Sequence, residues 1–430
     1  MTVTERENLT REIEIFLKAG FSPRYDETKL HFGSSEIWGK FGSLGTELWL
    51  DTGSIEDAEA LWTREFRALT TNNTLLNREI QTGRYDAIIP EMGELLESHG
   101  ELSERDKRLE FAFMLNAWHA MRLVERFESW VSVEEHTDLA HDVERAVEYA
   151  RRYYRLCPER FIVKIPFTPT GLLATRRLAM EGVPINHTLG FSARQNYVAA
   201  RIARPRFVNV FLGRLNSFVS SNELGSGDMV GEKATLASQT AVREIRKRYG
   251  VETRQIGASL RNGQQILDLA GLDVLTMPPK AAQEFLAYNP RPDDITDRTD
   301  RLYSAGVNAN VDMTKTRLNT LWHISPELVD CVDQLENEDL DSFTPDDLIG
   351  FFEEHGCGDV LVRWSDEERE VSTVEGKIPR LANWEEKLAS GAIGLDSLMN
   401  LAGLCSFAKD QKAMDERVEE VLTAHPVHHV

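Results

Sequence analysis

The chain has 430 residues, of which 41% are hydrophobic and 28% are charged, a balance that is ordinary for a globular protein with a sizeable core. Its 49 basic and 70 acidic residues give a formal charge of −21. We expect no nucleic-acid partner, because such binding depends on Lys and Arg neutralising phosphates. Any anionic ligand would need a local cluster of basic groups against this overall field.

The start of the chain, MTVTERENLT, lacks the apolar segment of a secretory signal, and no run of 18 apolar residues follows. We therefore expect a cytoplasmic protein without a membrane partner. The four cysteines show no CxxC pair and no His at zinc spacing, which predicts reduced thiols and no metal site. The HPVHH end could bind a metal, but we interpret it as a tail.

Residues 1–45 are predicted to form an N-terminal extension with one amphipathic helix, in the stretch ENLTREIEIFLKAG. Beyond it, short apolar or β-branched runs recur between longer helical stretches. These eight candidate strands are Thr46–Thr52, Leu69–Asn72, Trp130–Glu134, Arg160–Pro166, Ile185–Phe191, Phe207–Arg214, Arg254–Leu260 and Asp273–Pro278.

Runs such as FIV and VFL lack polar alternation, as expected for parallel strands that are covered on both faces. Strands alternating with helices indicate a closed (β/α)8 TIM barrel or a doubly wound open sheet. The number of strands favours the α/β barrel, which we predict over residues 46–325. The longest crossover, 73–129, is expected to carry an extra helical insertion.

Residues 326–430 are acidic and are predicted to form a mostly helical C-terminal region. Thr344-Pro345 with Asp347 is typical of a helix start there. Three roles stay open for this region: it could cover the barrel mouth, form a homodimer interface, or shield apolar surface.

Functional side chains of a barrel lie at the C-terminal ends of its strands and in the loops that follow. Polar or charged residues occupy these positions at most of the predicted strands, which together predict a pocket. The residues are Asp51, Asn72, Glu134, Lys164, Asn186 with Thr188, Arg214, and Ser259 with Arg261.

Lys164 is the most informative of them, because it lies inside the apolar run FIVKIP. Burial disfavours the charged form of a lysine, and Schiff-base chemistry requires the neutral amine. The alternative is a lysine that extends along the barrel rim to water.

Two carboxylates are candidates for proton transfer. Glu134 ends the strand before Lys164, and it could shuttle protons or merely neutralise the lysine; Glu135 competes if the register shifts by one. Asp51 could act as a base or cap the following helix, although Ser54 is the better cap.

Arg214 and Arg261 lie on adjacent predicted strands, and Ser259-Leu260-Arg261-Asn262-Gly263 leads into a helix. Helix amides and arginines together make an anion site; the alternative is that both arginines pair with acidic surface residues. HExxH, P-loop and GxSxG motifs are absent, and Gly225-Ser226-Gly227 is interpreted as a loop, so no cofactor is expected.

The chain resembles the transaldolases, Schiff-base enzymes of sugar-phosphate metabolism in the class I aldolase superfamily. The resemblance covers roughly residues 46–290 and is most specific in FIVKIPFTPTGLLATRRLAMEGVPINHTLGFS and IGASLRNGQQILDLAGLDVLTMPP. It implies a transferase of the pentose phosphate pathway that moves a dihydroxyacetone unit from a ketose phosphate to an aldose phosphate.

The resemblance also implies residue roles. Lys164 would form the Schiff base, Glu134 would act as acid/base through a water held by Thr188, and Asp51 would take the proton of the C4 hydroxyl. The implied substrate-binding residues are Asn72, Asn186, Phe211, Arg214, Ser259 and Arg261, the last three holding the phosphate.

The chain departs from the family pattern at Asn73, where a proline is usual, at Asn209, which replaces a serine, and at His187, where an apolar residue is common. We expect these three positions to lie near the pocket, which leaves the identity of the sugar open. Two further hypotheses also stay open. One is an aldolase on the same scaffold that releases dihydroxyacetone or uses a sulfonated ketose. The other is a sugar-phosphate sensor without catalysis.

Overall fold

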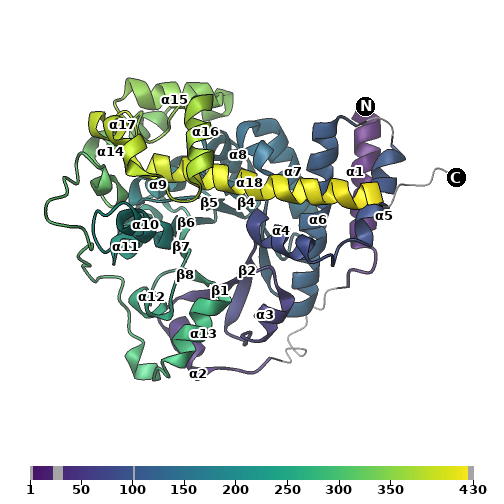
Figure 1. Cartoon of the computed structure of the whole chain (residues 1–430), viewed down its shortest axis with the longest axis horizontal. Helices are drawn as coiled ribbons and strands as arrows, with labels where there is room; N and C mark the ends of the chain where they lie inside the picture. Colours follow the sequence, from purple (N-terminus) through teal and green to yellow (C-terminus); the bar gives the residue numbers. More distant parts are fainter. Residues whose placement is uncertain (1–2, 23–31, 100–101, 425–430) are drawn as a thin grey trace.

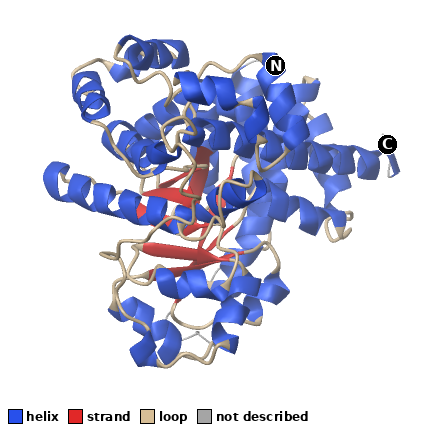
Figure 2. Ribbon diagram, turned by 60° about the vertical axis from the view of Figure 1, so that its left-hand side comes forward, coloured by secondary structure: helices blue, strands red, loops and turns tan. Residues whose placement is uncertain are grey.

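The eight strands form one closed parallel barrel in sequence order, surrounded by helices (Figures 1 and 2). A computed structural model describes residues 3–22, 32–99 and 102–424, so the HPVHH tail lies outside the described residues. The predicted (β/α)8 barrel is confirmed. Its strands are β1 Glu47–Asp51, β2 Phe66–Thr70, β3 Trp130–Glu134, β4 Phe161–Pro166, β5 Ile185–Thr188, β6 Phe207–Phe211, β7 Arg254–Ala258 and β8 Val274–Met277.

The helices that follow the strands close the outer layer, and the crossover after β2 carries the predicted helical insertion, α4 to α6. Through the barrel the α-helices are α2 Glu36–Ser43, α3 Ile55–Glu59, α4 Asn73–Gln81, α5 Ile88–Glu97, α6 Glu104–Phe127, α7 Val143–Leu156, α8 Pro169–Met180, α9 Ala193–Val198, α10 Leu212–Ser221, α11 Val230–Tyr249, α12 Gly263–Asp268 and α13 Pro279–Ala287.

Four predicted strands, those ending at Asn72, Phe191, Arg214 and Leu260, extend two or three residues beyond the observed ends at Thr70, Thr188, Phe211 and Ala258. Thr71 and Asn72 lie beyond β2, because the Asn72 side chain accepts a hydrogen bond from the Leu75 N–H and caps α4. β6 ends at Phe211 and passes directly into α10, so Arg214 lies in the first turn of a helix and not on a strand.

The N-terminal helix α1 (Val3–Lys18) packs on α6 and α5. Leu9, Ile13 and Leu17 are buried and recur every four residues, which places them on one face of the helix. This face is the reason that the amphipathic pattern was readable from the sequence.

The C-terminal helices are α14 Pro326–Leu335, α15 Pro345–Glu354, α16 Asp366–Glu375, α17 Glu385–Ser390 and the long α18 Leu395–Ala424. α18 runs across the barrel past α4, α5 and α16 (Figure 1). Its Leu398, Leu401 and Phe407 belong to the same apolar cluster as the barrel core. This packing supports two of the three roles left open, covering the barrel mouth and shielding apolar surface; the region boundaries near 45 and 325 stay predictions.

Candidate active site

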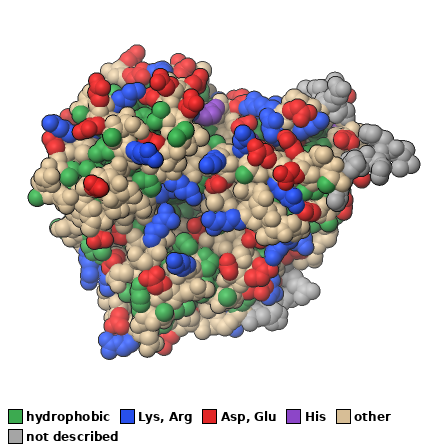
Figure 3. Space-filling model, viewed as in Figure 1, with side chains coloured by type: hydrophobic (Ala, Val, Ile, Leu, Met, Phe, Trp, Pro, Cys, Tyr) green, Lys and Arg blue, Asp and Glu red, His purple; other side chains and the backbone are tan. Residues whose placement is uncertain are grey.

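A cavity of about 430 Å³ opens at the C-terminal ends of the strands. Lys and Arg side chains gather around the hollow on this face of an otherwise acidic molecule (Figure 3). Most of the predicted site residues line the cavity, and two, Glu134 and Thr188, are buried beside it. The lining residues among them are Asp51, Asn72, Lys164, Asn186, Phe211, Arg214, Ser259 and Arg261.

Lys164 lies within β4 with its side chain directed into the barrel mouth. The residue is 3% exposed, so the alternative of a lysine extending to water is wrong. Its Nζ donates a hydrogen bond to the Thr71 carbonyl oxygen at 3.1 Å and lies 3.7 Å from the Glu134 carboxylate. The amine is thus held by one backbone acceptor and one acid inside a cavity.

Glu134 is opposite Lys164 in the β3–β4 register. Its carboxylate accepts a hydrogen bond from the Asn73 N–H at 3.1 Å. Burial raises the pKa of Glu134, and Lys164 and the Asn73 hydrogen bond partly offset that increase. A carboxyl group that resists ionisation beside an amine can both give and take a proton.

Glu135 is the neighbour that competed for this role. Successive side chains of a strand point to opposite faces, so Glu135 points away from the cavity that Glu134 borders. Glu135 is also buried, and burial raises its pKa well above the usual value, with Glu134 adding to the effect. The register of β3 therefore favours Glu134 as the group that faces Lys164.

β5 supplies two inward side chains. Asn186 donates a hydrogen bond to the Ser132 hydroxyl and accepts one from the Asn209 amide, both at 3.1 Å. Thr188 is fully buried, and its hydroxyl has no hydrogen-bond partner among the described residues. An unpaired buried hydroxyl near the lysine is suited to hold a water molecule.

His187, between these two residues, points outward, so the expectation that it lies near the pocket is wrong. It makes a 3.1 Å hydrogen-bonding contact with the Thr175 hydroxyl of α8 and packs against Phe167. Burial lowers the pKa of His187 to about 3, so the ring is a neutral core group.

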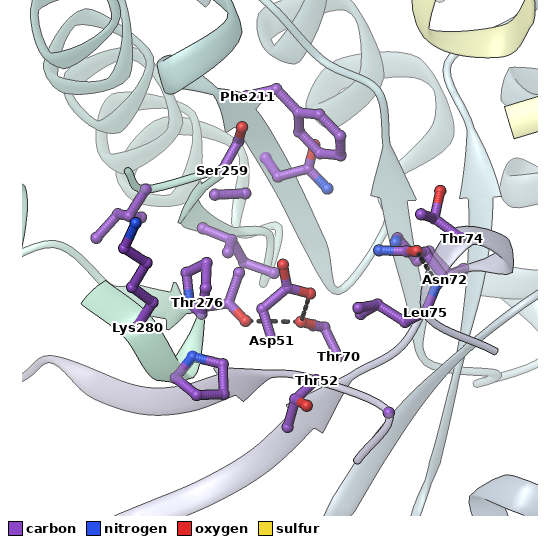
Figure 4. A pocket seen from close by; sticks show the side chains of 18 of the residues that line it. Asp51, Thr52, Thr70, Asn72, Thr74, Leu75, Phe211, Ser259, Thr276 and Lys280 are labelled. Atoms are coloured by element: carbon purple, nitrogen blue, oxygen red, sulfur yellow. Dashed lines mark hydrogen bonds between the residues drawn. The ribbon is translucent and has the colours of Figure 1, made fainter. Parts of the chain in front are cut away.

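Asp51 ends β1 on the opposite side of the cavity, in a chain of hydroxyl groups (Figure 4). The Thr70 hydroxyl donates to its carboxylate at 2.7 Å and lies 2.7 Å from the Thr276 hydroxyl. Burial raises the pKa of Asp51, and Lys164 and Thr70 lower it in part. Since Ser54 caps α3, Asp51 is free from the alternative role of a helix cap.

Arg214 and Arg261 meet because Gly213 has no side chain. A Cβ atom at Gly213 would lie 2.2 Å from the Ser259 carbonyl oxygen and 2.7 Å from the Arg261 side chain. The loop after β7 therefore packs directly on the first turn of α10. This contact, and not a pair of strand ends, unites the two arginines.

Both guanidinium groups lack an acidic partner within 4 Å in the described part of the chain, so the predicted alternative of surface ion pairs finds no support. Burial and Arg261 lower the pKa of Arg214 to about 10, and one of its terminal nitrogens is buried without a hydrogen bond. Burial also lowers the pKa of Arg261, which Asp51 partly offsets. Two guanidinium groups in this state can bind an anion.

Two backbone amides at the start of α12 already have hydrogen-bond partners within the protein. The Asn262 side chain accepts from the Gln265 N–H at 3.1 Å, and the Arg261 N–H donates to the Gln265 side chain at 2.6 Å. These donors are already satisfied. Ser259 lines the cavity in a left-handed conformation with φ 64°.

Phe211 forms part of an aromatic wall with Phe407 of α18, and the two ring centroids lie 6.5 Å apart. The Phe407 ring lies 5.8 Å from Lys164 Nζ and 5.4 Å from the Arg214 guanidinium carbon. Phe407 was missed because its position depends on α18 crossing the barrel, which has no local sequence signal.

Asn209, one of the three departures from the family pattern, lines the cavity as expected. Other lining residues were missed, among them Arg78, Thr276, Lys280 and Lys377. Lys280 just after β8 was a visible signal. Arg78 and Lys377 carried none.

Within the described residues, no group of three His, Cys, Asp or Glu side chains is placed to hold a metal ion. Over the same residues, no helix has both the length and the apolar character needed to cross a membrane. The cavity instead presents amine, carboxyl, amide, hydroxyl and guanidinium groups.

Comparison with known proteins agrees with this chemistry. A sequence model of the family described as Transaldolase/Fructose-6-phosphate aldolase matches residues 48–347. A "Probable transaldolase" of Dictyostelium discoideum is 27% identical over 221 residues, covering 50% of this chain and 68% of that protein. A "Transaldolase" of Gloeobacter violaceus is 28% identical over 247 residues, covering 55% and 62%. A "Transaldolase" of Shewanella baltica is 26% identical over 296 residues, covering 67% and 89%.

Proposed function

This chain belongs to the transaldolase/fructose-6-phosphate aldolase family, and on that premise we propose that it moves a dihydroxyacetone unit from a ketose phosphate to an aldose phosphate. The carrier of the unit is a Schiff base on Lys164. The observation that carries the proposal is the buried Lys164 amine, 3.7 Å from Glu134, in a cavity that also holds two guanidinium groups with no ion-pair partner among the described residues.

Formation of the Schiff base begins with attack of the neutral Lys164 amine on the C2 carbonyl of the ketose. Glu134 protonates the departing hydroxyl group of the carbinolamine, which leaves as water, and a water molecule held by Thr188 relays the proton. The raised pKa of Glu134 supports this role, because a carboxyl group that holds its proton more tightly than an exposed glutamate is better able to act as an acid.

Cleavage follows when Asp51 takes the proton of the C4 hydroxyl. The C3–C4 bond breaks, its electron pair moves toward the iminium nitrogen as an enamine, and the aldose leaves. The hydrogen bond from Thr70 orients the Asp51 carboxylate, and the raised pKa of Asp51 makes it a stronger base than an exposed aspartate.

Transfer reverses these steps with a second aldehyde. The enamine carbon attacks the carbonyl carbon of the acceptor, and Asp51 returns its proton to the new hydroxyl group. Asn186 and Asn72 hold the hydroxyl groups of the three-carbon unit, while Arg214, Arg261 and Ser259 bind the phosphate and Phe211 lines the pocket. Hydrolysis of the imine by the reverse of its formation releases the new ketose phosphate.

The proposal is tested by incubating the protein with a ketose phosphate donor and an aldose phosphate acceptor. We expect a new ketose phosphate whose three terminal carbons come from the donor, as followed by isotope labelling. Absence of transfer with every donor and acceptor pair of a broad panel would contradict the proposed function.

An aldolase is the second candidate, because the family description names fructose-6-phosphate aldolase beside transaldolase. The two activities differ in the fate of the enamine, which an aldolase protonates to release free dihydroxyacetone. Measuring free dihydroxyacetone with and without an acceptor aldehyde separates them: a transferase releases little in either case.

A further inference from the structure

We infer that Lys377, in the loop between α16 and α17, is a third cation of the anion subsite and selects substrates with a dianionic phosphate end. This inference rests on the proposed function and deepens it. Lys377 lines the same cavity as Arg214 and Arg261, although it comes from a segment beyond the residues that match the family.

The loop that carries Lys377 is fixed to the helix that carries Arg214. Asn222, the C-cap of α10, donates a hydrogen bond to the Pro379 carbonyl oxygen at 3.0 Å and accepts one from the Leu381 N–H at 2.8 Å. α10 therefore carries Arg214 in its first turn, and its C-cap Asn222 holds the loop of Lys377. The two cations are positioned by one rigid element.

The approach of Lys377 from α16 is also fixed. α16 begins at a capping box in which Ser365 and Glu368 bond reciprocally, and it ends at Glu375. Its C-cap, Gly376, has a positive φ of 79°, which glycine adopts readily, immediately before Lys377. α16 packs along α18, so the loop is supported from both sides.

The charges around Lys377 favour an anionic ligand. Within the described residues no ion pair is formed by its ammonium group, and its pKa is lowered by partial burial at the cavity and by Arg214. Asp410 is the nearby acid that opposes this effect, but its carboxylate also accepts a hydrogen bond from Thr74. Lys377 and Arg214 repel each other, and few acids nearby offset that repulsion. Binding of an anion between them would therefore be favourable.

A phosphate monoester carries about −1.5 to −2 charges at neutral pH, whereas a sulfonate carries one. Two guanidinium groups suffice to neutralise a monoanion. A third cation beside Arg214 and Arg261 adds most to the binding of a dianion, so the subsite favours a phosphorylated over a sulfonated sugar. Arg78, Lys164 and Lys280 also line the cavity.

Calorimetric titration of inorganic phosphate and of methanesulfonate, which is a monoanion, into the full chain tests the inference without any reaction. We compare the parent with Lys377→Met, Lys377→Arg and the matched control Lys409→Met. Lys409 is an exposed lysine of α18 that does not line the cavity, so its removal makes the same change in net charge.

Loss of one charge-assisted contact is expected to weaken phosphate binding by roughly tenfold in Lys377→Met. Lys409→Met stays within about twofold of the parent, and Lys377→Arg retains most of the affinity. If Lys377→Met binds phosphate like Lys409→Met, the inference is wrong. Lys377 is exposed and outside the apolar core, so these variants are expected to fold, which circular dichroism checks.

Borohydride trapping with dihydroxyacetone, which carries no charge, separates this inference from the proposed function. Equal trapping in all variants with weaker phosphate binding in Lys377→Met supports both. Weaker phosphate binding without trapping in the parent supports the subsite and refutes the Schiff base. Equal trapping with unchanged phosphate binding refutes the subsite alone.

Discussion

Replacing Arg214 by Met is expected to stabilise the ligand-free protein while abolishing its response to phosphate. Arg214 is buried beside Arg261, and this environment lowers its pKa to about 10. Keeping the guanidinium charged in that place costs free energy at every pH below about 10. Methionine keeps much of the apolar stem and removes the charge.

The expected size follows from the contacts of Arg214. The lowered pKa corresponds to about 3 kcal/mol, at ~1.4 kcal/mol for each pH unit. The guanidinium also lies 5.3 Å from the Phe211 ring and 5.4 Å from the Phe407 ring, and loss of two such contacts costs about 1–2 kcal/mol. We therefore expect a net gain of about 1–2 kcal/mol in the free energy of unfolding.

Urea unfolding with and without inorganic phosphate measures both effects. The parent should gain about 1.4 kcal/mol when phosphate is tenfold above its dissociation constant, whereas Arg214→Met should gain little. Arg67→Met, which removes an exposed arginine of β2, controls for net charge. A ligand-free Arg214→Met that is less stable than the parent, or that gains as much from phosphate, would refute the reasoning.

Three further substitutions test other parts of the site. Burial raises the pKa of Glu135 well above its usual value, so folding takes up a proton and the stability of the parent falls as pH rises above about 4.3. The stability of Glu135→Gln relative to the parent should therefore grow by up to ~1.4 kcal/mol per pH unit from pH 5 to 7. A stability difference that does not change with pH argues against this. Gly213→Ala should displace the Arg261 loop, lower the free energy of unfolding in urea by about 1–3 kcal/mol, and raise KM for phosphorylated donors. The control Gly39→Ala, whose new methyl group meets nothing within 4 Å, should have none of these effects. Asp51→Asn should retain borohydride trapping of dihydroxyacetone at Lys164 and lose transfer by at least ~100-fold, and loss of trapping as well would assign Asp51 to an earlier step.

The barrel was predictable because its strands are buried on both faces and therefore appear as short apolar runs. Lys164 and Glu134 were predictable for the same reason, since a charged residue within or at the end of a short apolar run stands out in the sequence. Arg214 was placed on a strand because VFLGR continues the apolar pattern, whereas the structure begins a helix at Leu212. Element ends are set by local hydrogen bonds that the pattern does not contain.

The contribution of the C-terminal region could not be predicted. Phe407 and Lys377 reach the cavity because α18 packs across the barrel and Asn222 holds the loop after α16. These contacts join segments that are far apart in sequence, and neither residue lies in a recognisable motif. His187 shows the reverse error, because a polar residue beside Asn186 belongs to the opposite face of the strand.

Reduction with borohydride in the presence of a ketose phosphate, followed by peptide mass mapping, tests the Schiff base most directly. A stable adduct of the three-carbon unit is expected on the peptide that contains Lys164, and none in Lys164→Met. Labelling of a different lysine, or an unlabelled Lys164 under conditions in which the ketose is turned over, would contradict the account.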